Sequence, residues 1–226
     1  MKGSNEVYNH FTDGFGFYRL FWVFLIGCVL GVVVETLWCL LTRHRFESRV
    51  GLIYGPLNPV YGVGALALAV GLHPVRDSRD IVICIAGAIL GSIVEYVCSW
   101  VQEKSFGSVS WDYSKMFFNL HGRINLLYSI FWGGLAIFWV KDIYPRMIRW
   151  ISHIPNKIGI PLTWVLLVFV VVDIAVSACA VYRWKQRIEK IEPQTQFEYF
   201  MDEHYPDERM QKIYPNMKFK NADVQQ

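Results

Sequence analysis

The sequence predicts an all-α fold, a polytopic transmembrane helix bundle of about five spans with an internal two-helix repeat and a short helical polar tail. Three observations predict it. Of the 226 residues 54% are hydrophobic, and the mean hydropathy is +0.27. The charged residues gather between long apolar runs instead of being spread evenly. Finally, a Gly-x-x-x-Gly-x-x-x-Glu pattern occurs twice, ending at Glu35 and at Glu95.

The apolar runs give the domain organisation. Each run has about 17 to 23 residues, enough to cross a hydrocarbon core of about 30 Å. The first run is too long for a cleavable signal peptide and no small-residue cleavage pattern follows it, so it is expected to stay in the membrane. We expect a transmembrane domain over residues 1–182 and a charged tail over 183–226. The predicted spans are 21–41, 56–72, 81–101, 124–140 and 160–182, with repeat one at 21–72, repeat two at 81–140 and the last span as an extra helix.

The repeated glutamates are the first candidate site. A carboxylate in the middle of a membrane helix costs about 3 kcal/mol on insertion scales, so it is expected to face the bundle interior and to have a partner. Residues four apart lie on one stripe of a helix, and the glycines of that stripe allow a second helix to approach closely. Glu35 and Glu95 would then lie at similar depth in parallel repeats. Two interpretations remain open, a buried carboxylate that hydrogen-bonds to a neighbouring helix and a direct role in binding a solute or proton.

The loops after the two glutamate helices add three candidates. When one inserted residue is allowed, Asn58 aligns with Asn119, which gives each repeat an asparagine before its second helix. The apolar centre of segment 111–125 predicts that this loop dips into the membrane interface or folds back over the helices. Arg123 opens the fourth span, where it can pair with a carboxylate, bind an anionic group of a ligand or snorkel to phosphates.

Asp173 is a third intramembrane acid, without a repeat partner. It either completes a polar path with the glutamates or hydrogen-bonds within the bundle. The five cysteines all lie in apolar spans and are expected to be packing residues, and the histidines lack metal-site spacing. We therefore expect neither a cofactor nor a metal.

Charge patterning gives a topology and an environment for the tail. Five spans put the termini on opposite sides, and the slight bias of Lys and Arg favours an N-terminus outside and a cytoplasmic C-terminus in a multi-pass cell-membrane protein. The basic residues that follow the last span suit contact with anionic headgroups. Segments 197–202 and 205–215 of the tail read as short amphipathic helices. The basic residues are distributed over nearly every loop, so nothing indicates nucleic-acid binding.

Three segments resemble a known family. The first is Gly55-Pro56-Leu57-Asn58-Pro59-Val60-Tyr61-Gly62, and the second runs from Trp111 to Leu126 and contains Asn-Leu-His-Gly-Arg-Ile-Asn-Leu at 119–126. The third is Tyr205-Pro206-Asp207-Glu208-Arg209-Met210. Together they resemble the prokaryotic integral-membrane family labelled ABC-transporter permease type IV, or CmpB-like. The resemblance implies a permease. The sequence contains no G-x-x-x-x-G-K-[ST] pattern, so an ATPase would come from a separate subunit, and a homodimer would reach the size of a full permease.

The leading hypothesis is a membrane permease or channel-like protein, not an enzyme, that moves an ion or small solute through a polar site. Its binding residues are predicted to be Glu35, Glu95, Asn58, Asn119, Arg123 and Asp173. Two alternatives remain open. One is a membrane-embedded enzyme acting on a lipid-type substrate, with two carboxylates and an arginine as acid, base and anion clamp. The other is a non-catalytic membrane subunit that recruits a partner through its tail.

Overall fold

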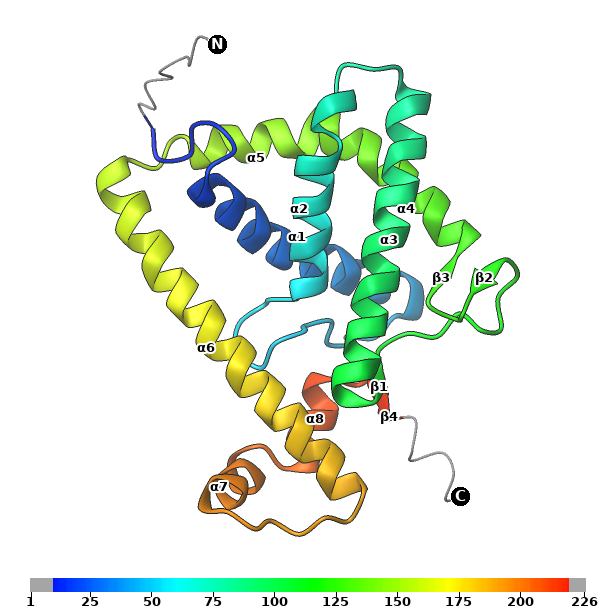
Figure 1. The fold of residues 1–226 in the computed structure, drawn as a ribbon, viewed down its shortest axis with the longest axis vertical. Coiled ribbons are helices and arrows are strands. Elements are labelled where there is room, and N and C mark those ends of the chain that lie inside the picture. The colour runs from blue at the N-terminus through cyan, green and yellow to red at the C-terminus, as the bar shows by residue number, and fades with distance from the viewer. Residues whose placement is uncertain (1–9, 220–226) are drawn as a thin grey trace, which may run out of the picture.

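The computed structural model describes residues 10–219 and is built almost entirely of helices (Figure 1). The helices are α1 (Phe17–Arg43), α2 (Pro59–Gly71), the 3-10 turn η1 (His73–Val75), α3 (Asp80–Phe106), α4 (Leu126–Phe138), the π-helical segment η2 (Trp139–Ile143), α5 (Tyr144–Ile151), α6 (Asn156–Ile188), α7 (Gln196–His204) and α8 (Asp207–Ile213). Four strands of two residues each, β1 (Ser108–Val109), β2 (Asn119–Leu120), β3 (Ile124–Asn125) and β4 (Lys218–Phe219), form two small antiparallel pairs.

Four helical segments are long and apolar enough to cross a membrane, and the protein is a multi-pass membrane protein. These segments are Phe17–Thr42, Asp80–Phe106, Leu126–Ile151 and Asn156–Ile188. The predicted span 56–72 is shorter than expected, because helix α2 begins only at Pro59 and has 13 residues. At 1.5 Å per residue this helix is about 20 Å long, less than a hydrocarbon core of about 30 Å. Four of the five predicted spans are therefore long enough to cross the membrane, and the fifth, α2, is a short apolar helix.

The helix lengths repeat. Helices α1 and α3 have 27 residues each, and the helices that follow them, α2 and α4, have 13 each. Only the second short helix is extended, through η2 and α5 to Ile151. Pro145 explains the wide turn at the junction, because its nitrogen carries no hydrogen to donate to the carbonyl four residues earlier. The predicted span 124–140 consequently continues beyond its expected end.

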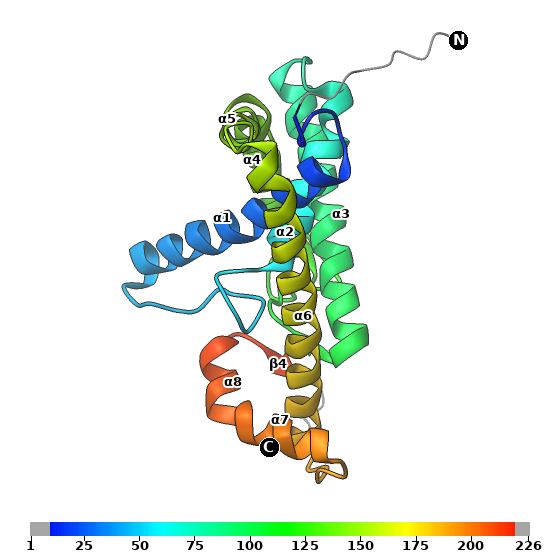
Figure 2. The ribbon, with the colours of Figure 1, turned by 90° about the vertical axis from the view of Figure 1, so that its left-hand side faces the viewer.

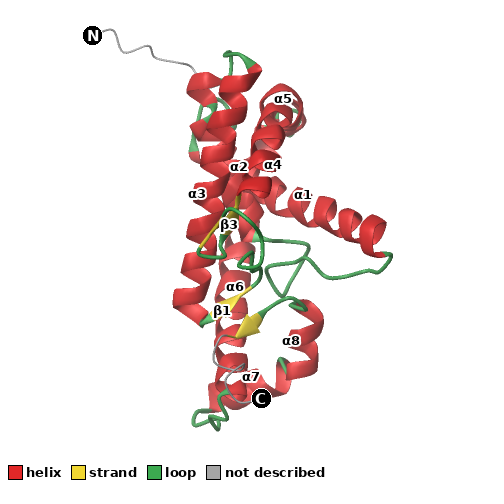
Figure 3. Cartoon of the chain, turned by 90° about the vertical axis from the view of Figure 1, so that its right-hand side faces the viewer, coloured by secondary structure: helices red, strands yellow, loops and turns green. Residues whose placement is uncertain are grey.

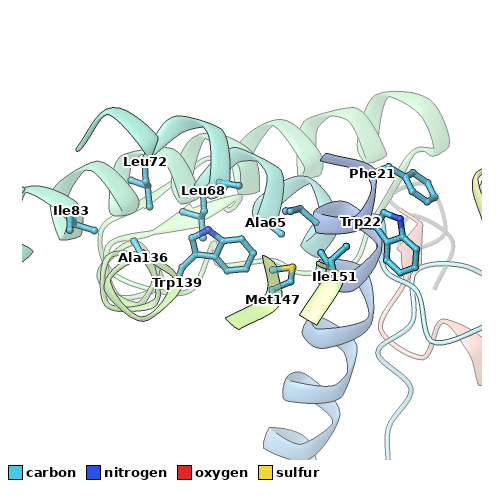
Figure 4. Close-up of a cluster of buried hydrophobic side chains, with 12 residues drawn as sticks. Phe21, Trp22, Ala65, Leu68, Leu72, Ile83, Ala136, Trp139, Met147 and Ile151 are labelled. Atoms are coloured by element: carbon cyan, nitrogen blue, oxygen red, sulfur yellow. The ribbon is translucent and has the colours of Figure 1, made fainter. Parts of the chain in front are cut away.

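A hydrophobic cluster joins the helices at one end of the bundle (Figure 4). It combines the start of α1, the buried face of α2, one residue of α3 and the α4–η2–α5 segment. Leu68 of α2 and Leu72, the C-cap of this helix, belong to the cluster and are 2% and 1% exposed. Trp139 of η2 packs there too. The first and second halves of the chain are thus fastened together through the two short helices.

The far half of α1 stands out from the other helices (Figure 2). Val34, Trp38 and Leu41 are 64%, 65% and 73% exposed there. Such a continuous apolar surface is unfavourable in water and suits a hydrocarbon environment. This arrangement agrees with a helix whose surroundings are lipid.

The tail folds back onto the end of α6 and reaches α3 (Figure 3). Its last described residues form β4, which pairs with β1 directly after α3, Ser108 opposite Phe219. Met201 and Met210 are buried against the end of α6. The two predicted tail helices are confirmed as α7 and α8, and Thr195 and Glu198 form a capping box at the start of α7.

Two of the basic residues after the last span are not available to headgroups, contrary to expectation. The Arg183 side chain is 4% exposed and donates two hydrogen bonds to Asp202, at 2.9 and 2.8 Å. Arg187 contacts the same carboxylate at 2.5 Å and Asp207 at 2.6 Å. The reason is non-local, since the acids that neutralise these arginines come from the helices of the tail itself.

Candidate functional site

The two glycine stripes receive the short helices in the same way. A Cβ on Gly27 would collide with Ala65 of α2, and a Cβ on Gly31 would collide with the ring of Tyr61. In the second half, Gly87 and Gly91 stand in the same relation to Ala136 and Trp132 of α4. Tyr61 and Ala65 therefore correspond to Trp132 and Ala136. The internal repeat expected from the sequence is present as a repeated helix-packing arrangement.

Glu95 lies one turn beyond Gly91 and is 8% exposed. The close approach at Gly91 brings the indole of Trp132 beside the carboxylate, where Nε1 donates to Oε2 at 3.3 Å. The Tyr113 hydroxyl donates to Oε1 at 2.9 Å. Both carboxylate oxygens thus have a donor, which offsets the cost of burying this polar group.

Glu35 occupies the corresponding position of α1 in a different environment. Its Oε1 lies 3.2 Å from Nη1 of Arg49, and its side chain is 34% exposed. Arg49 also lies 3.4 Å from Glu47 and donates to the sulfur of Cys39 at 2.8 Å. One repeat therefore satisfies its glutamate with an ion pair, and the other with neutral hydrogen-bond donors.

Tyr113 is the loop residue that contacts Glu95. Burial raises the pKa of its hydroxyl, and the carboxylates of Glu95 and, to a smaller extent, Glu35 raise it further. The phenol therefore remains a neutral donor to Glu95. The ring stacks on Tyr128, with centroids 4.7 Å apart and an angle of 17°. No sequence pattern singles out Tyr113 for this role, although the apolar character of segment 111–125 predicts a loop that folds over the helices.

Arg123 pairs with a carboxylate, as one of its interpretations predicted, but the partner is neither repeat glutamate. Its Nη1 donates to Glu103 at 2.7 Å, and its guanidinium carbon lies 5.5 Å from the centroid of the Tyr96 ring. The two carboxylate oxygens of Glu95 accept instead from Tyr113 and Trp132. Arg123 thus braces the hairpin of β2 and β3 against α3.

Asn58 is the N-cap of α2, where its Oδ1 accepts from the Val60 amide at 3.1 Å. The residue with this role in α4 is Asn125, which accepts from the Leu127 amide at 2.9 Å. Each cap also donates to a carbonyl of the preceding loop, Asn58 to that of Arg49 and Asn125 to that of Phe117. The sequence alignment of Asn58 with Asn119 is therefore not kept in three dimensions.

Asn119 instead holds the turn of the hairpin. Its amide nitrogen donates to the carbonyls of Met116 and Ser114, and its Oδ1 accepts from the amide of Gly122 at 3.0 Å. Gly122 has a φ of +68°, a conformation that favours glycine. Asn119 shapes the loop that carries Tyr113.

Asp173 of α6 hydrogen-bonds to the loop between α1 and α2. It is 1% exposed, and its Oδ1 accepts from the Tyr54 amide at 3.1 Å and from the Ser177 hydroxyl at 3.2 Å. The amide of Ile53 donates to the same hydroxyl at 2.9 Å. These contacts match the interpretation of Asp173 as a hydrogen-bonding residue within the bundle, and they attach the loop between α1 and α2 to α6.

Metal ligation finds no support in the described residues 10–219, where no three His, Cys, Asp or Glu side chains are grouped to hold an ion. His121 instead shares a hydrogen bond of 2.9 Å with the hydroxyl of Tyr96. The five cysteines are free thiols; Cys28 and Cys39 are buried, whereas Cys179 is exposed.

Comparison with known proteins gives one result. The model of the family described as "Putative ABC-transporter type IV" matches residues 22–178, which include both glycine stripes, both glutamates and Asp173. Searches of curated proteins and of solved structures found no match.

Proposed function

Because this chain belongs to the family described as "Putative ABC-transporter type IV", we propose that it is a permease or channel-like subunit that moves an ion or small solute through a polar site formed by Glu35 and Glu95. The observation that supports this proposal is the equivalent position of the two carboxylates, each one turn beyond a glycine stripe that receives a short helix, with the Tyr113 hydroxyl hydrogen-bonded to Glu95. Two carboxylates and a neutral hydroxyl are suited to a cation, a proton or a solute with hydrogen-bond donors.

The two glutamates have different roles in this proposal. Glu95 is buried among neutral donors, whereas Glu35 is partly exposed and paired with Arg49. An exposed carboxylate can exchange its partner with the surroundings more readily than a buried one. Glu35 is accordingly the entry side of the site, and Glu95 the inner side. Asn58, Asn119 and Arg123 position the two loops, and Asp173 holds the first loop against α6.

An ATPase subunit, if the family description applies in full, is a separate chain that would bind on the cytoplasmic side. We place the N-terminus outside and the tail in the cytoplasm, following the slight bias of basic residues between alternate loops, and this placement requires the short helix α2 to cross as a fifth span. The tail rests on the end of α6 and reaches α3, so that it would lie between the membrane helices and such a partner.

Flux into liposomes tests the proposal. The purified chain is reconstituted and challenged with a panel of monovalent cations, protons and small solutes. We expect Glu95→Gln and Glu35→Gln each to reduce a detected flux at least about tenfold, which corresponds to about 1.4 kcal/mol. Asp77→Asn is the matched control, because this carboxylate is exposed in the turn between η1 and α3.

The result that contradicts the proposal is an unchanged flux in the double variant Glu35→Gln/Glu95→Gln. If instead deletion of residues 194–226 abolishes function while both glutamine variants are tolerated, the non-catalytic subunit that recruits a partner becomes the better description. Lipid turnover that is lost with either glutamate would favour the membrane-embedded enzyme.

A further inference from the structure

An apolar groove of about 450 Å³ lies on the outer side of α3. Its floor is one face of that helix from Ala88 to Val97, and its wall is formed by Leu120 and Ile124 of the β2–β3 hairpin and by Ser129 of α4. Ile93 and Val97 are 54% and 48% exposed, so the groove is open to the surroundings of the helix. None of the residues assigned to the polar site above lines it.

The groove lies at the depth of the hydrocarbon core. Helix α3 is apolar from Ile81 to Val101 and carries charge only at its ends, apart from Glu95 on another face. The nine-residue rise from Ala88 to Val97 is about 14 Å, which is about half of a core of roughly 30 Å. The groove is therefore as long as one leaflet is deep.

The polar atoms in the groove are already satisfied by the protein. The hydroxyls of Ser92 and Ser129 lie 2.7 Å apart, so that one donates to the other, and the accepting hydroxyl donates in turn to a backbone carbonyl four residues earlier, that of Ala88 or of Asn125. Water in such a cavity would find few partners, and a site needs two to four polar partners to hold a water molecule. A hydrocarbon ligand needs no polar partners and can occupy the groove without them.

The two ends of the groove differ. The end near Val97 lies beside the Tyr96–His121 hydrogen bond and the guanidinium of Arg123 over the Tyr96 ring. The charged residues Glu103 and Lys104 follow about two turns further along α3. The end at Ala88 lies deeper, among apolar residues of the helix. An amphiphile would place its polar part near Val97 and its chain towards Ala88.

We propose that this groove binds one acyl chain of a membrane phospholipid, with the glycerol end near Tyr96 and His121 and the chain end near Ala88. Acyl chains are the apolar molecules present at this depth at solvent concentration, and Leu120 and Ile124 of the hairpin form a wall against which one chain can pack. This inference does not depend on the polar site, because the groove and Glu95 lie on different faces of α3, and Glu35 lies on α1.

The test measures retained phospholipid. Wild-type protein is reconstituted with phosphatidylcholine, extracted in mild detergent and weighed by native mass spectrometry. We expect one tightly retained lipid, and at least a fivefold loss of that species in Val97→Trp and Ile93→Trp, whose indoles would fill the groove. Ile85→Trp is the control, since Ile85 is 55% exposed on the same helix but does not line the groove.

A second measurement keeps the result independent of folding. Phosphatidylcholine with a photoreactive group at the chain terminus should label the peptide that contains Ala88 and Ile89 in wild type, and the label should fall in Val97→Trp while the elution volume of the protein stays unchanged. Equal lipid retention in all variants, labelling spread evenly over α3, or crosslinking of the groove to another polypeptide would each overturn the proposal.

Discussion

Tyr113 donates a hydrogen bond of 2.9 Å to Glu95, so a residue from a loop completes the environment of a carboxylate in the middle of a membrane helix. The loop reaches this depth because its hairpin is braced by the Arg123–Glu103 ion pair and by the turn that Asn119 holds. Irregular backbone is tolerated at such a depth where protein covers it or where it lines a cavity. The proposed site therefore depends on the hairpin as much as on the helices.

Removing the Tyr113 hydroxyl should destabilise the protein through Glu95. In Tyr113→Phe, Oε1 of a buried carboxylate loses its donor, which typically costs about 1–3 kcal/mol. We expect a lower midpoint of thermal unfolding in detergent, with a smaller effect when Glu95→Gln is already present. Tyr199→Phe is the control, because Tyr199 is 61% exposed. Equal effects of Tyr113→Phe in both backgrounds would show that the two side chains are not coupled.

The glycine stripes should tolerate no side chain. Gly91→Ala places a methyl group against the ring of Trp132, and overpacking of this kind costs about 1–3 kcal/mol. Gly31→Ala should behave alike against Tyr61. Gly134→Ala in α4 is the matched control: nothing lies within 4 Å of its added Cβ, so the higher helix propensity of alanine should leave stability unchanged or raise it. Thermal unfolding ranks the three variants, and a stable Gly91→Ala protein would contradict the packing described here.

The tail should detach when its central acid is neutralised. Asp202→Asn leaves the buried Arg183 guanidinium without a charged partner, and we expect a loss of roughly 2–3 kcal/mol, moderated because the Asp202 side chain is 24% exposed. Trypsin should then cut faster within residues 189–213. Glu208→Gln, an exposed position of α8, should leave the rate unchanged. Similar cleavage in both variants would mean that the ion pairs do not hold the tail.

Docking of the tail should also depend on pH in a defined direction. Burial acts to raise the pKa of Asp202, but the guanidinium groups of Arg183 and Arg187 outweigh it and hold the pKa below the ordinary aspartate value. A lowered pKa in the folded state means that the stabilisation is complete above the ordinary value and is lost as the pH falls through the lowered one.

Fluorescence of Trp184, which packs against the tail, should therefore be constant near neutral pH and change only in acid. In Asp202→Asn the same acid transition should shrink. A transition of undiminished size in that variant would assign it to another group.

Much of the fold could be predicted from local sequence patterns. The lengths of the apolar runs located the long helices, and the recurrence of Gly27, Gly31 and Glu35 as Gly87, Gly91 and Glu95 revealed the repeat. These features depend on residues that are near one another in the chain, so the period and length of a helix are sufficient to read them. The length of α2 was overestimated, because the hydropathy of the segment does not show that the helix begins only at Pro59, with Asn58 as its N-cap.

What the tertiary structure alone decided is the partner of each polar group. Glu35 and Glu95 have the same sequence context, yet one pairs with Arg49 and the other with Tyr113 and Trp132. Likewise, the sequence predicts that Arg183 and Arg187 contact headgroups. In the structure the tail folds back, and its Asp202 neutralises both arginines. A hydrogen bond or an ion pair acts over a few ångströms between segments whose separation in space no local pattern records. The sequence by itself determined which helices form and which helices carry a carboxylate. Only the packing of the loops and the tail onto those helices determined the hydrogen-bond or ion-pair partner of each charged side chain.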